Sequence, residues 1–385
     1  MKVLYVSPYP PAQDGIGNYT YLLAKGAREQ GHDVRVVVPH PTSNPLPDVM
    51  GAVGSRGRES VKLREAIAKW DPDVVHVQFA IAAFGTQAVA LLRWLDALRC
   101  ELPVPVVGTL HEVTRDTAML RATGRAFYRR MVARCEHVIV HTRTAYNALT
   151  GPVGVPESKA VVIPHPNVPP PVGTSTPEDV RHHFGLGEAR VLLAFGFIHV
   201  DKGLDDLVGA LSILHRTGEV PLDDVRVVVA GAVRPRHGLF RIFEIRDRLY
   251  FARVLRQARR ESLQQYLVLS GYVPEAEISA WFRIAEAVVL PYRRTDQSGV
   301  ASLASAFGVP VIASTVGGLR EQYAESCWSF PPRTPEFLAR VLAAFLAAPP
   351  SEQTQLIPPP HVSDLASVIK ATFDLYCKNT SGQLV

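Results

Sequence analysis

The chain has 385 residues, more than a single compact core usually takes, so two domains are expected. Hydrophobic residues make up 47% of it and charged residues 20%, which excludes a mostly disordered protein because burial can offset the chain entropy. The 41 lysines and arginines against 36 acidic residues leave a formal net charge of +5. This is too small to predict a nucleic-acid partner, but it suits an anionic substrate.

The four cysteines are scattered along the sequence, at Cys100, Cys135, Cys327 and Cys377. They form no Cys-x-x-Cys pair or Cys/His cluster, so neither a zinc site nor a disulfide framework is predicted. The N-terminal segment lacks the apolar core of a signal peptide, and the longest near-apolar helical run, 337–348, is too short to span a bilayer. We therefore expect a soluble, cytoplasmic protein.

The first residues predict a βαβ unit. An apolar run at 3–6 is typical of a buried parallel strand, and a proline-rich loop follows it. Helical periodicity then continues to Gly31, a favourable residue just beyond a helix, and a second apolar run covers 34–38. Such a crossover is expected to be right-handed.

This alternation of strands and helices continues along the chain. Further strands are expected at 74–77, 104–109, 138–140, 161–163, 191–195, 225–230, 267–269, 287–290 and 309–313. Helices are expected between them, at 58–69, 88–100, 123–135 and 203–216. The pattern predicts an α/β protein with two Rossmann-like, doubly wound domains facing a central cleft, the usual place for a ligand. We place the domains at 1–166 and 185–361, joined by a proline- and glycine-rich linker at 167–184.

The segment 234–260 is rich in arginine, interleaved with apolar residues at helical spacing. Its arginines are Arg234, Arg236, Arg241, Arg246, Arg248, Arg253, Arg256, Arg259 and Arg260. One interpretation is an amphipathic helix with a solvated basic face. The other is a surface for an anionic partner, such as lipid headgroups or a polyphosphorylated acceptor, which leaves open a peripheral location at the inner membrane face.

Two glycine-rich turns between strands and helices could hold phosphate. Gly15 and Gly17 stand at the first, but a dinucleotide fingerprint would need a third glycine and an acid after the next strand. In the second domain Lys202 lies in a loop between a strand and a helix, and Ser298 and Gly299 open another helix. These features predict a diphosphate held by a lysine, an arginine and exposed backbone amides.

In this order, nine segments together resemble the retaining glycosyltransferases of family 4, which have the GT-B fold. The segments are the Gly-rich loop with GHDVRVVVP, DPDVVHVQ, VVGTLHE, VVIPHPNV, FGFIHVDKGLDDLVGAL, SGYVPEAEI, VVLPYR, SGVASLASAFGVPVIAS and VGGLREQ. The resemblance covers nearly the whole chain. It implies that 1–166 is the acceptor side, that 185–361 binds the donor, and that a helix in 362–385 returns to the first domain.

The resemblance also implies roles for single residues. His111 matches the histidine that reaches the transferred sugar, and Lys202 the lysine that neutralises the diphosphate leaving group. The loop with Gly15 and Gly17 would face the donor diphosphate and the acceptor. The remaining matches are Ser298, Gly299 and Val300 at the distal phosphate, and Tyr272 and Val273 at the nucleotide base. A lone histidine is often only structural, but at a strand's carboxyl end it points into the ligand crevice.

The sequence departs from the family at three places. Thr295 and Leu303 stand where many members have two glutamates, and Phe197 stands where an arginine is usual. A variant subgroup with the same QSGV sequence also resembles this chain. The residues that could replace the lost contacts are His199, Arg293 and Arg294 for the charge, Asp296 and Gln297 for a sugar hydroxyl, and Glu321 for donor or acceptor.

The function implied is transfer of a sugar, with retention, from a UDP- or GDP-type nucleotide diphosphate sugar to an acceptor hydroxyl. The acceptor could be a glycan, a lipid-linked sugar or a small natural product. No Asp-x-Asp motif sits at a strand end, so neither a cofactor nor an obligatory metal is expected. Two alternatives stay open: a non-catalytic GT-B partner protein, because the glutamates are missing, or a nucleotide-sugar epimerase of the same fold.

Overall fold

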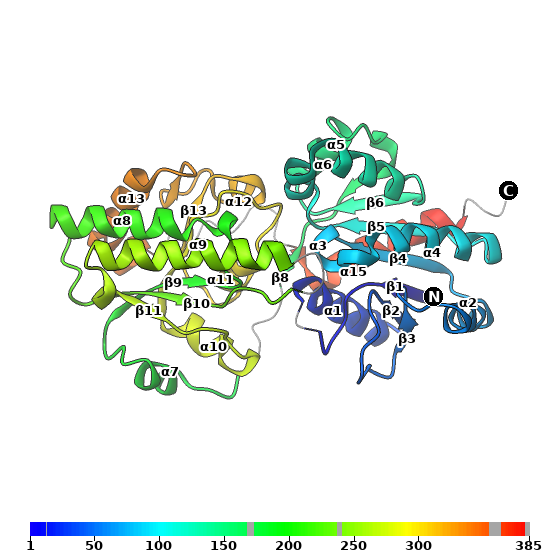
Figure 1. Cartoon of the computed structure of the whole chain (residues 1–385), viewed down its shortest axis with the longest axis horizontal. Coiled ribbons are helices and arrows are strands. Elements are labelled where there is room, and N and C mark those ends of the chain that lie inside the picture. Colours follow the sequence, from blue (N-terminus) through cyan, green and yellow to red (C-terminus); the bar gives the residue numbers. More distant parts are fainter. Residues whose placement is uncertain (13, 168–172, 237–240, 354–362, 382–385) are drawn as a thin grey trace. The chain divides into compact units, whose positions relative to one another are not determined.

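The structure, a computed structural model, describes residues 1–12, 14–167, 173–236, 241–353 and 363–381. The chain divides into unit 1, Met1–Pro166 with Ser363–Val385, and unit 2, Asn167–Val362 (Figure 1). Parts of the expected linker (168–172) and of the arginine-rich segment (237–240) lie outside the described residues, as does the expected boundary at 361–362.

Unit 1 is built on a parallel sheet of seven strands in the order β3-β2-β1-β4-β5-β6-β7. The strands are β1 (Lys2–Val6), β2 (Asp33–Val38), β3 (Val49–Ala52), β4 (Val74–Phe79), β5 (Val106–Leu110), β6 (His137–Val140) and β7 (Ala160–Val162). The chain runs outward from β1 to β3 and then returns to β4 on the other side of β1. This reversal makes the sheet doubly wound, and it places a topological switch point between β1 and β4.

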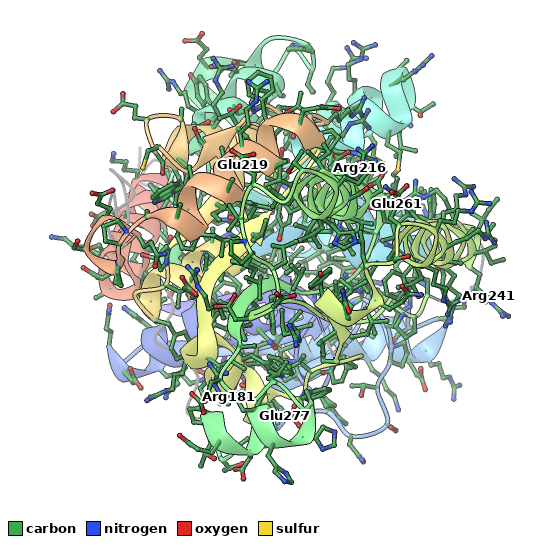
Figure 2. The ribbon with its side chains drawn as sticks, turned by 90° about the vertical axis from the view of Figure 1, so that its left-hand side faces the viewer. Arg181, Arg216, Glu219, Arg241, Glu261 and Glu277 are labelled. Carbon is green, nitrogen blue, oxygen red and sulfur yellow. The ribbon has the colours of Figure 1, made fainter. Side chains whose placement is uncertain are left out.

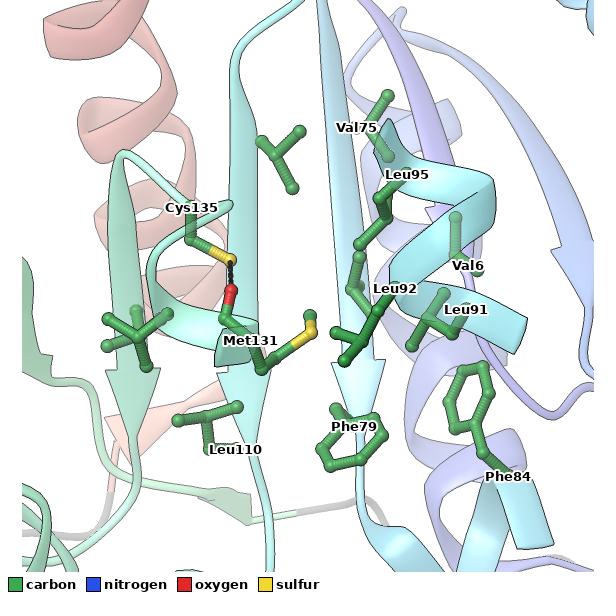
Figure 3. Packing of buried hydrophobic residues seen from close by; sticks show 14 of the residues in the cluster. Val6, Val75, Phe79, Phe84, Leu91, Leu92, Leu95, Leu110, Met131 and Cys135 are labelled. Atoms are coloured by element: carbon green, nitrogen blue, oxygen red, sulfur yellow. Dashed lines mark hydrogen bonds between the residues drawn. The ribbon is translucent and has the colours of Figure 1, made fainter. Parts of the chain in front are cut away.

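Helices cover both faces of this sheet because the side chains of β1 alternate between two cores. They are α1 (Gly15–Glu29), α2 (Arg58–Trp70), α3 (Ile81–Phe84), η1 (Gly85–Gln87), α4 (Ala88–Glu101), α5 (Val113–Val132), α6 (Arg143–Thr150), η2 (Glu157–Lys159) and α15 (Leu365–Ser381). Leu4 and Val6 pack into the core that contains α4, and Val3 and Tyr5 pack into the core that contains α1 and α15. Figure 3 shows Leu91 and Leu95 of α4 over the first of these cores.

The stretch Ile81–Glu101 is long and apolar enough to cross a membrane by length and composition. In the structure it is broken at Gly85, which has a φ of 54°, and it forms three short elements rather than one helix. Leu91, Leu95 and Leu98 are fully buried against the sheet. The stretch therefore has the packing of a core helix.

Helix α5 of unit 1 differs from the sequence-based expectation in its start, whereas α15 lies within the range 362–385 where a helix is expected. Helix α5 begins at Val113, ten residues before the predicted start, and Arg121 interrupts it with a φ of 48°. Helix α15 runs from Leu365 to Ser381 and packs on α1, where Gly26 leaves room for the Ile369 side chain. A Cβ at Gly26 would lie 2.4 Å from Ile369 Cδ1.

Unit 2 repeats the design with a parallel sheet of six strands in the order β11-β10-β9-β12-β13-β14. These are β9 (Arg190–Phe195), β10 (Val225–Ala230), β11 (Leu267–Leu269), β12 (Ala285–Leu290), β13 (Val311–Ser314) and β14 (Ser329–Phe330). The helices are α7 (Pro177–His183), η3 (Val200–Lys202), α8 (Leu204–Thr217), α9 (Arg241–Arg260), η5 (Gln264–Tyr266), α10 (Glu275–Ile284), α11 (Gly299–Ala306), α12 (Gly317–Tyr323), α13 (Pro335–Ala347) and α14 (Pro350–Gln353). A separate two-stranded pair joins β8 (Pro166–Asn167) and β15 (Ser363–Asp364).

The doubly wound α/β fold predicted from the sequence is confirmed in both units. In unit 2 the chain leaves β9 toward β11 and returns to β12 on the other side of β9. The loops after β9 and β12 therefore diverge at the carboxyl edge of the sheet, and such switch points are where ligands bind in doubly wound folds.

Candidate functional site

The switch point of unit 2 holds Lys202, the lysine predicted from the sequence. It ends the short helix η3, which follows β9, and its ammonium lies 3.7 Å from the centre of the Tyr292 ring, which follows β12. Among the described residues no carboxylate lies within 4.0 Å of this ammonium, since no ion pair of Lys202 is found there. A half-buried cation on an aromatic face, without an acidic partner, is suited to binding an anion.

A small hollow opens beside Lys202. Gly196, Phe197 and Lys202 line it from the loop after β9, and Pro291 and Tyr292 line it from the loop after β12. The hollow thus lies between the two loops that diverge at the switch point, where the sequence places the diphosphate.

The two loops are fixed to each other by close backbone contacts. Gly203 has a φ of 65°, and a Cβ there would lie 1.9 Å from the carbonyl oxygen of Pro291. The amide of Arg293 donates a hydrogen bond of 2.8 Å to the carbonyl of Asp201. Only glycine can occupy position 203 without moving the second loop, so the site is preorganised by the backbone.

Arg293, one of the predicted charge replacements, is held in an ion-pair network. Its guanidinium donates to both carboxylate oxygens of Asp206, at 3.0 and 2.7 Å, and to Asp205 at 2.7 Å. Asp205 also accepts a hydrogen bond of 2.7 Å from the Tyr250 hydroxyl. Burial raises the pKa of Asp206, although Arg293 opposes this. Arg293 therefore anchors the loop after β12 to α8. Because the carboxylates of Asp205 and Asp206 largely neutralise its charge, it is poorly suited to binding an anionic ligand.

Arg234, which the sequence places in the arginine-rich segment 234–260, lies at this site instead. It follows β10, and its guanidinium lies 5.4 Å from the centre of the Phe197 ring. The backbone brings them together, because Ile198 and Val233 form a parallel bridge. An arginine thus lies over the phenylalanine that replaces the family's arginine. No local sequence signal links the two positions, since the bridge joins loops after different strands.

The predicted phosphate cradle is the start of α11. Ser298 is its N-cap, and its Oγ accepts a hydrogen bond of 3.2 Å from the amide of Ala301. The first amides of the helix, at Gly299 and Val300, point toward its N-terminus, where a partial positive charge develops. A Cβ at Gly299 would meet no atom within 4 Å, so the backbone there is open to a ligand.

The two positions that lack glutamates are occupied differently. The Thr295 hydroxyl donates to the carbonyl of Gln297 within the same loop, and the carbonyl of Thr295 packs under Gly317, where a Cβ would lie 1.7 Å away. Leu303 packs against the apolar core beneath α11. Neither side chain can supply the carboxylate found in many family members.

The other predicted contacts lie around this edge in different environments. Arg294 and Glu321 are exposed, Asp296 is buried, and Gln297 is half-buried. His199 is half-buried, and its Nδ1 lies 4.0 Å from Asp201. In the loop between β11 and α10, the Tyr272 ring is 49% exposed, whereas Val273 packs into the core. Of these, Arg294, Glu321 and Tyr272 have exposed side chains.

Unit 1 gathers three histidines at the carboxyl edge of its own sheet. His111 follows β5, His141 follows β6, and His165 lies beyond β7. Their ring centres are 4.9 Å apart for His111 and His141 and 5.4 Å apart for His141 and His165, and the ring of Tyr19 in α1 contacts all three. Sequence reasoning selected only His111, because the other two come from different strands and show no shared spacing.

These rings are neutral: His111 and His141 are buried, and His165 is half-buried beside them. Burial, followed by the neighbouring histidines, lowers the pKa of His111 well below its ordinary value. Burial also lowers the pKa of His141 to about 3 and that of His165 to about 4. His111 Nε2 donates to the Gln78 Oε1 at 2.8 Å, so the neutral ring presents Nδ1 as its acceptor.

A network of hydrogen bonds centred on His76 lies next to this cluster of histidines. His76 in β4 bonds to the hydroxyls of Tyr376 in α15 and Thr109 in β5, the latter at 2.7 Å, and the Gln78 amide lies 3.4 Å from it. Burial lowers the pKa of His76 to about 3. His76 is therefore a structural residue that connects α15 to the residues around His111.

The Gly15 and Gly17 turn differs from the predicted phosphate loop in one respect. The Asp14 carboxylate caps α1 and accepts hydrogen bonds from the amides of Ile16, at 2.8 Å, and Gly17, at 3.3 Å. A Cβ at Gly17 would lie 3.2 Å from the Tyr9 amide nitrogen, so glycine there allows a close loop approach, whereas Gly15 faces open space. An anion at this turn would compete with Asp14 for the same amides.

Comparisons with sequence families match both halves of the chain. Residues 13–166 match Glycosyltransferase Family 4, and residues 189–348 match Glycosyl transferases group 1. Over 392 residues the chain is 26% identical to a D-inositol 3-phosphate glycosyltransferase of Jonesia denitrificans, covering 90% of this chain and 87% of the relative. It is 25% identical to a glycogen synthase of Mycobacterium tuberculosis, with coverages of 83% and 80%.

Solved structures with the same fold cover nearly the whole chain. The structure of Anabaena HepE in complex with UDP superposes with a TM-score of 0.73 at 16% identity, over 98% of this chain and all of that one. The sucrose-phosphate synthase of Thermosynechococcus elongatus superposes with a TM-score of 0.71 at 17% identity, over 99% of this chain and 100% of the other. At such low identity these similarities establish the fold.

Proposed function

This chain belongs to the family 4 glycosyltransferases, with the GT-B fold, and we propose that it transfers a sugar from a nucleotide diphosphate sugar to a hydroxyl acceptor with retention of configuration. The main support for a nucleotide diphosphate sugar as the donor is the Lys202 ammonium, which lies on the Tyr292 ring beside the hollow at the switch point of unit 2. In this proposal the diphosphate of the donor binds against Lys202.

The proposed chemistry is stabilisation of a leaving group. As the bond from the sugar to the diphosphate breaks, negative charge develops on the leaving oxygens. Lys202 and the first amides of α11 would offset this charge with fixed donors, and no protein nucleophile is required. One preorganised donor in an oxyanion hole contributes about 2.7–4 kcal/mol to transition-state stabilisation, or about a hundredfold or more in rate, and we expect a contribution of this order here.

Arg234 is our candidate for the second cation. Its stacking on Phe197 places a guanidinium at the loop where the family usually carries an arginine side chain. Arg293 is held by Asp205 and Asp206 and anchors its loop to α8, so it is not our candidate for that charge. Arg294, which is exposed, is the remaining candidate.

The carboxyl edge of unit 1 is proposed to bind the neutral, hydroxyl-bearing part of the substrates. Its imidazoles are uncharged at neutral pH, and His111 presents an acceptor nitrogen because its Nε2 donates to Gln78. A neutral imidazole accepts a hydrogen bond from a sugar hydroxyl, whereas an imidazolium cannot. The Asp14 cap at α1 makes this edge less suited to the diphosphate than the edge of unit 2.

A UDP-sugar is the first donor to test. The Anabaena HepE structures were determined with UDP and with UDP-glucose, and they share this fold. We further propose that the reaction needs no divalent metal, because Lys202 and the first amides of α11 are proposed to offset the charge of the diphosphate. A GDP-sugar is the alternative donor.

The test is an incubation of the purified chain with UDP-glucose and GDP-mannose, each with a panel of glycan, lipid-linked and small hydroxyl acceptors, in the presence and absence of EDTA. The proposal predicts acceptor-dependent release of nucleotide diphosphate, unaffected by EDTA, and a product with the donor's anomeric configuration by proton NMR. An inverted product would contradict retention. Conversion of the donor to a stereoisomer without any acceptor would favour an epimerase.

A further inference from the structure

Helix α9 carries an unusual share of the charge of the chain. Within Arg241–Arg260 there are seven arginines, opposed only by Glu244 and Asp247. Its formal net charge of +5 equals that of the whole 385-residue chain, so the remaining residues sum to zero. A charge concentrated on one helix acts locally, whatever the mild overall balance.

The inner face of α9 attaches it firmly to unit 2. Tyr250, Val254 and Ala258 recur at a spacing of four residues and are buried in the core shared with α8 and the sheet. The Tyr250 hydroxyl also donates to Asp205 in α8 at 2.7 Å. Figure 1 shows α8 and α9 side by side over one face of the sheet. The outer face of α9 is therefore presented on a fixed support.

The first half of the outer face is apolar. Ile242, Ile245 and Leu249 are 67%, 54% and 55% exposed. At about 100° per residue these three side chains fall within about 60° of one another around the helix axis. They are three of the four exposed isoleucines and leucines among the described residues, the other being Leu269. Three such side chains in one stripe indicate a contact surface.

The second half of the same stripe is basic. Arg253, Arg256 and Arg260 are exposed, lie in the same sector of the helix, and have no ion pair among the residues that the structure describes. The two acids of α9 are already paired: Glu244 with Arg248 at 2.9 Å, and Asp247 with Arg246 at 3.0 Å. In Figure 2, Arg241 at the start of α9 extends outward.

We propose that the outer face of α9 is a docking surface for an anionic lipid bilayer. The stripe formed by Ile242, Ile245 and Leu249 inserts among the headgroups, and the arginines Arg253, Arg256 and Arg260 bind the lipid phosphates. An amphipathic helix with large apolar and arginine side chains on one exposed face is suited to lying in the plane of a membrane interface.

The apolar part of this face favours a bilayer over other anionic partners, because a bilayer offers both an apolar phase and anionic groups. A nucleic acid or a soluble polyphosphate would use the arginines but would leave the two isoleucines and the leucine in water. The same stripe of a second copy of the chain contains no acidic residue, so it offers the arginines no opposite charge in either orientation of the two helices. A bilayer with anionic headgroups satisfies both halves of the stripe at once.

The experiment is flotation of the purified full chain with phosphatidylcholine vesicles containing increasing fractions of phosphatidylglycerol, at low and high salt. We expect binding that rises with the anionic fraction and weakens with salt. The triple variant Arg253→Gln, Arg256→Gln, Arg260→Gln should lose binding on the order of 100-fold. The variant Ile242→Ser, Ile245→Ser, Leu249→Ser should lose the part of the binding that survives high salt.

The matched control removes the same charge elsewhere. Arg58, Arg93 and Arg283 are exposed and have no ion pair among the described residues, and their replacement by glutamine should leave vesicle binding within about twofold. Equal losses in both arginine triples would mean that net charge, and not α9, drives binding. Duplex DNA binding that is as tight as vesicle binding and indifferent to the serine variant would overturn the proposal, as would dimerisation through α9. The readout is independent of the proposed donor, because no substrate is present.

Discussion

The Lys202 ammonium lies 3.7 Å from the centre of the Tyr292 ring, and the two residues come from loops that follow adjacent parallel strands, β9 and β12. This contact fixes a cation at the point where the sheet of unit 2 reverses its strand order. The proposed function depends on it, because the strength of an anion contact depends on how well the cation is held in place.

Replacement of Lys202 should therefore abolish most of the activity without unfolding the protein. We expect Lys202→Ala to lower kcat/KM by about 10²–10³-fold, since one preorganised donor to the leaving group is removed. The free energy of unfolding in urea should fall by only about 1 kcal/mol, because Lys202 lacks an acidic partner among the described residues and loses only its contact with the Tyr292 ring. The matched control is Tyr292→Phe, which keeps the ring and removes a hydroxyl without a hydrogen-bond partner there.

The proposed role of Arg234 can be tested by removing its charge and placing a new charge at position 197. Arg234→Gln should lower kcat/KM by about tenfold or more, because a cation near the leaving group is lost. Adding Phe197→Arg to this variant should restore part of the activity, since it places an arginine where the family usually has one. Steady-state kinetics would measure both. If Arg294→Gln is the more damaging change, the second cation is Arg294.

Arg293 should act on stability. Arg293→Met leaves the buried Asp206 carboxylate without its bidentate partner, and breaking such a pair lowers the free energy of unfolding by about 2 kcal/mol or more. The neighbouring Arg294→Met is the control and should cost less than about 0.5 kcal/mol, because its side chain is exposed. Equal stability of the two variants in urea titrations would refute the structural role of Arg293.

The histidines of unit 1 with lowered pKa values, buried His76 and His141 and half-buried His165, predict a loss of stability in mild acid. Their lowered pKa values, about 3 for His76 and His141 and about 4 for His165, lie below the ordinary value near 6.5. Between these values the unfolded chain binds more protons than the folded one, so stability falls as the pH drops below about 6.5. Each ring contributes about 1.4 kcal/mol per pH unit in this window.

Calorimetry between pH 7 and pH 5 would measure this slope. His141→Gln should make it shallower by about one ring's contribution, because this substitution removes one titrating group. His182→Gln, on the exposed surface of α7, should leave the slope unchanged. A pH dependence identical in the wild type and His141→Gln would contradict the burial of a neutral ring at this position.

Most of the fold was predictable because its strands are apolar runs separated by amphipathic helices. The strand β3 was not predicted: it has only four residues, one of them Gly51, and lies at the sheet edge. The early start of α5 was also missed, since the break at Arg121 separates its first turns from the periodic part. Short edge strands and broken helices carry too few residues to show a period.

The candidate site was predictable where a single loop carries it. Lys202 and Ser298 each lie in a recognisable strand–loop–helix segment. The positions of Arg234 over Phe197 and of Gln78 beside His111 depend on loops and strands brought together only by the sheet. Such contacts leave no periodic signal in the sequence. The Asp14 cap, which occupies the first amides of α1, was missed although an acid directly before a helix is a recognisable start signal.

Calorimetric titration of UDP and GDP into the wild type, Lys202→Ala and Tyr292→Phe tests most directly whether the diphosphate binds at the switch point of unit 2. We expect one of the two nucleotides to bind the wild type and Tyr292→Phe with similar affinity, and Lys202→Ala to weaken this binding by about tenfold or more. An affinity that is unchanged by Lys202→Ala would contradict the assignment of the diphosphate to the switch point of unit 2.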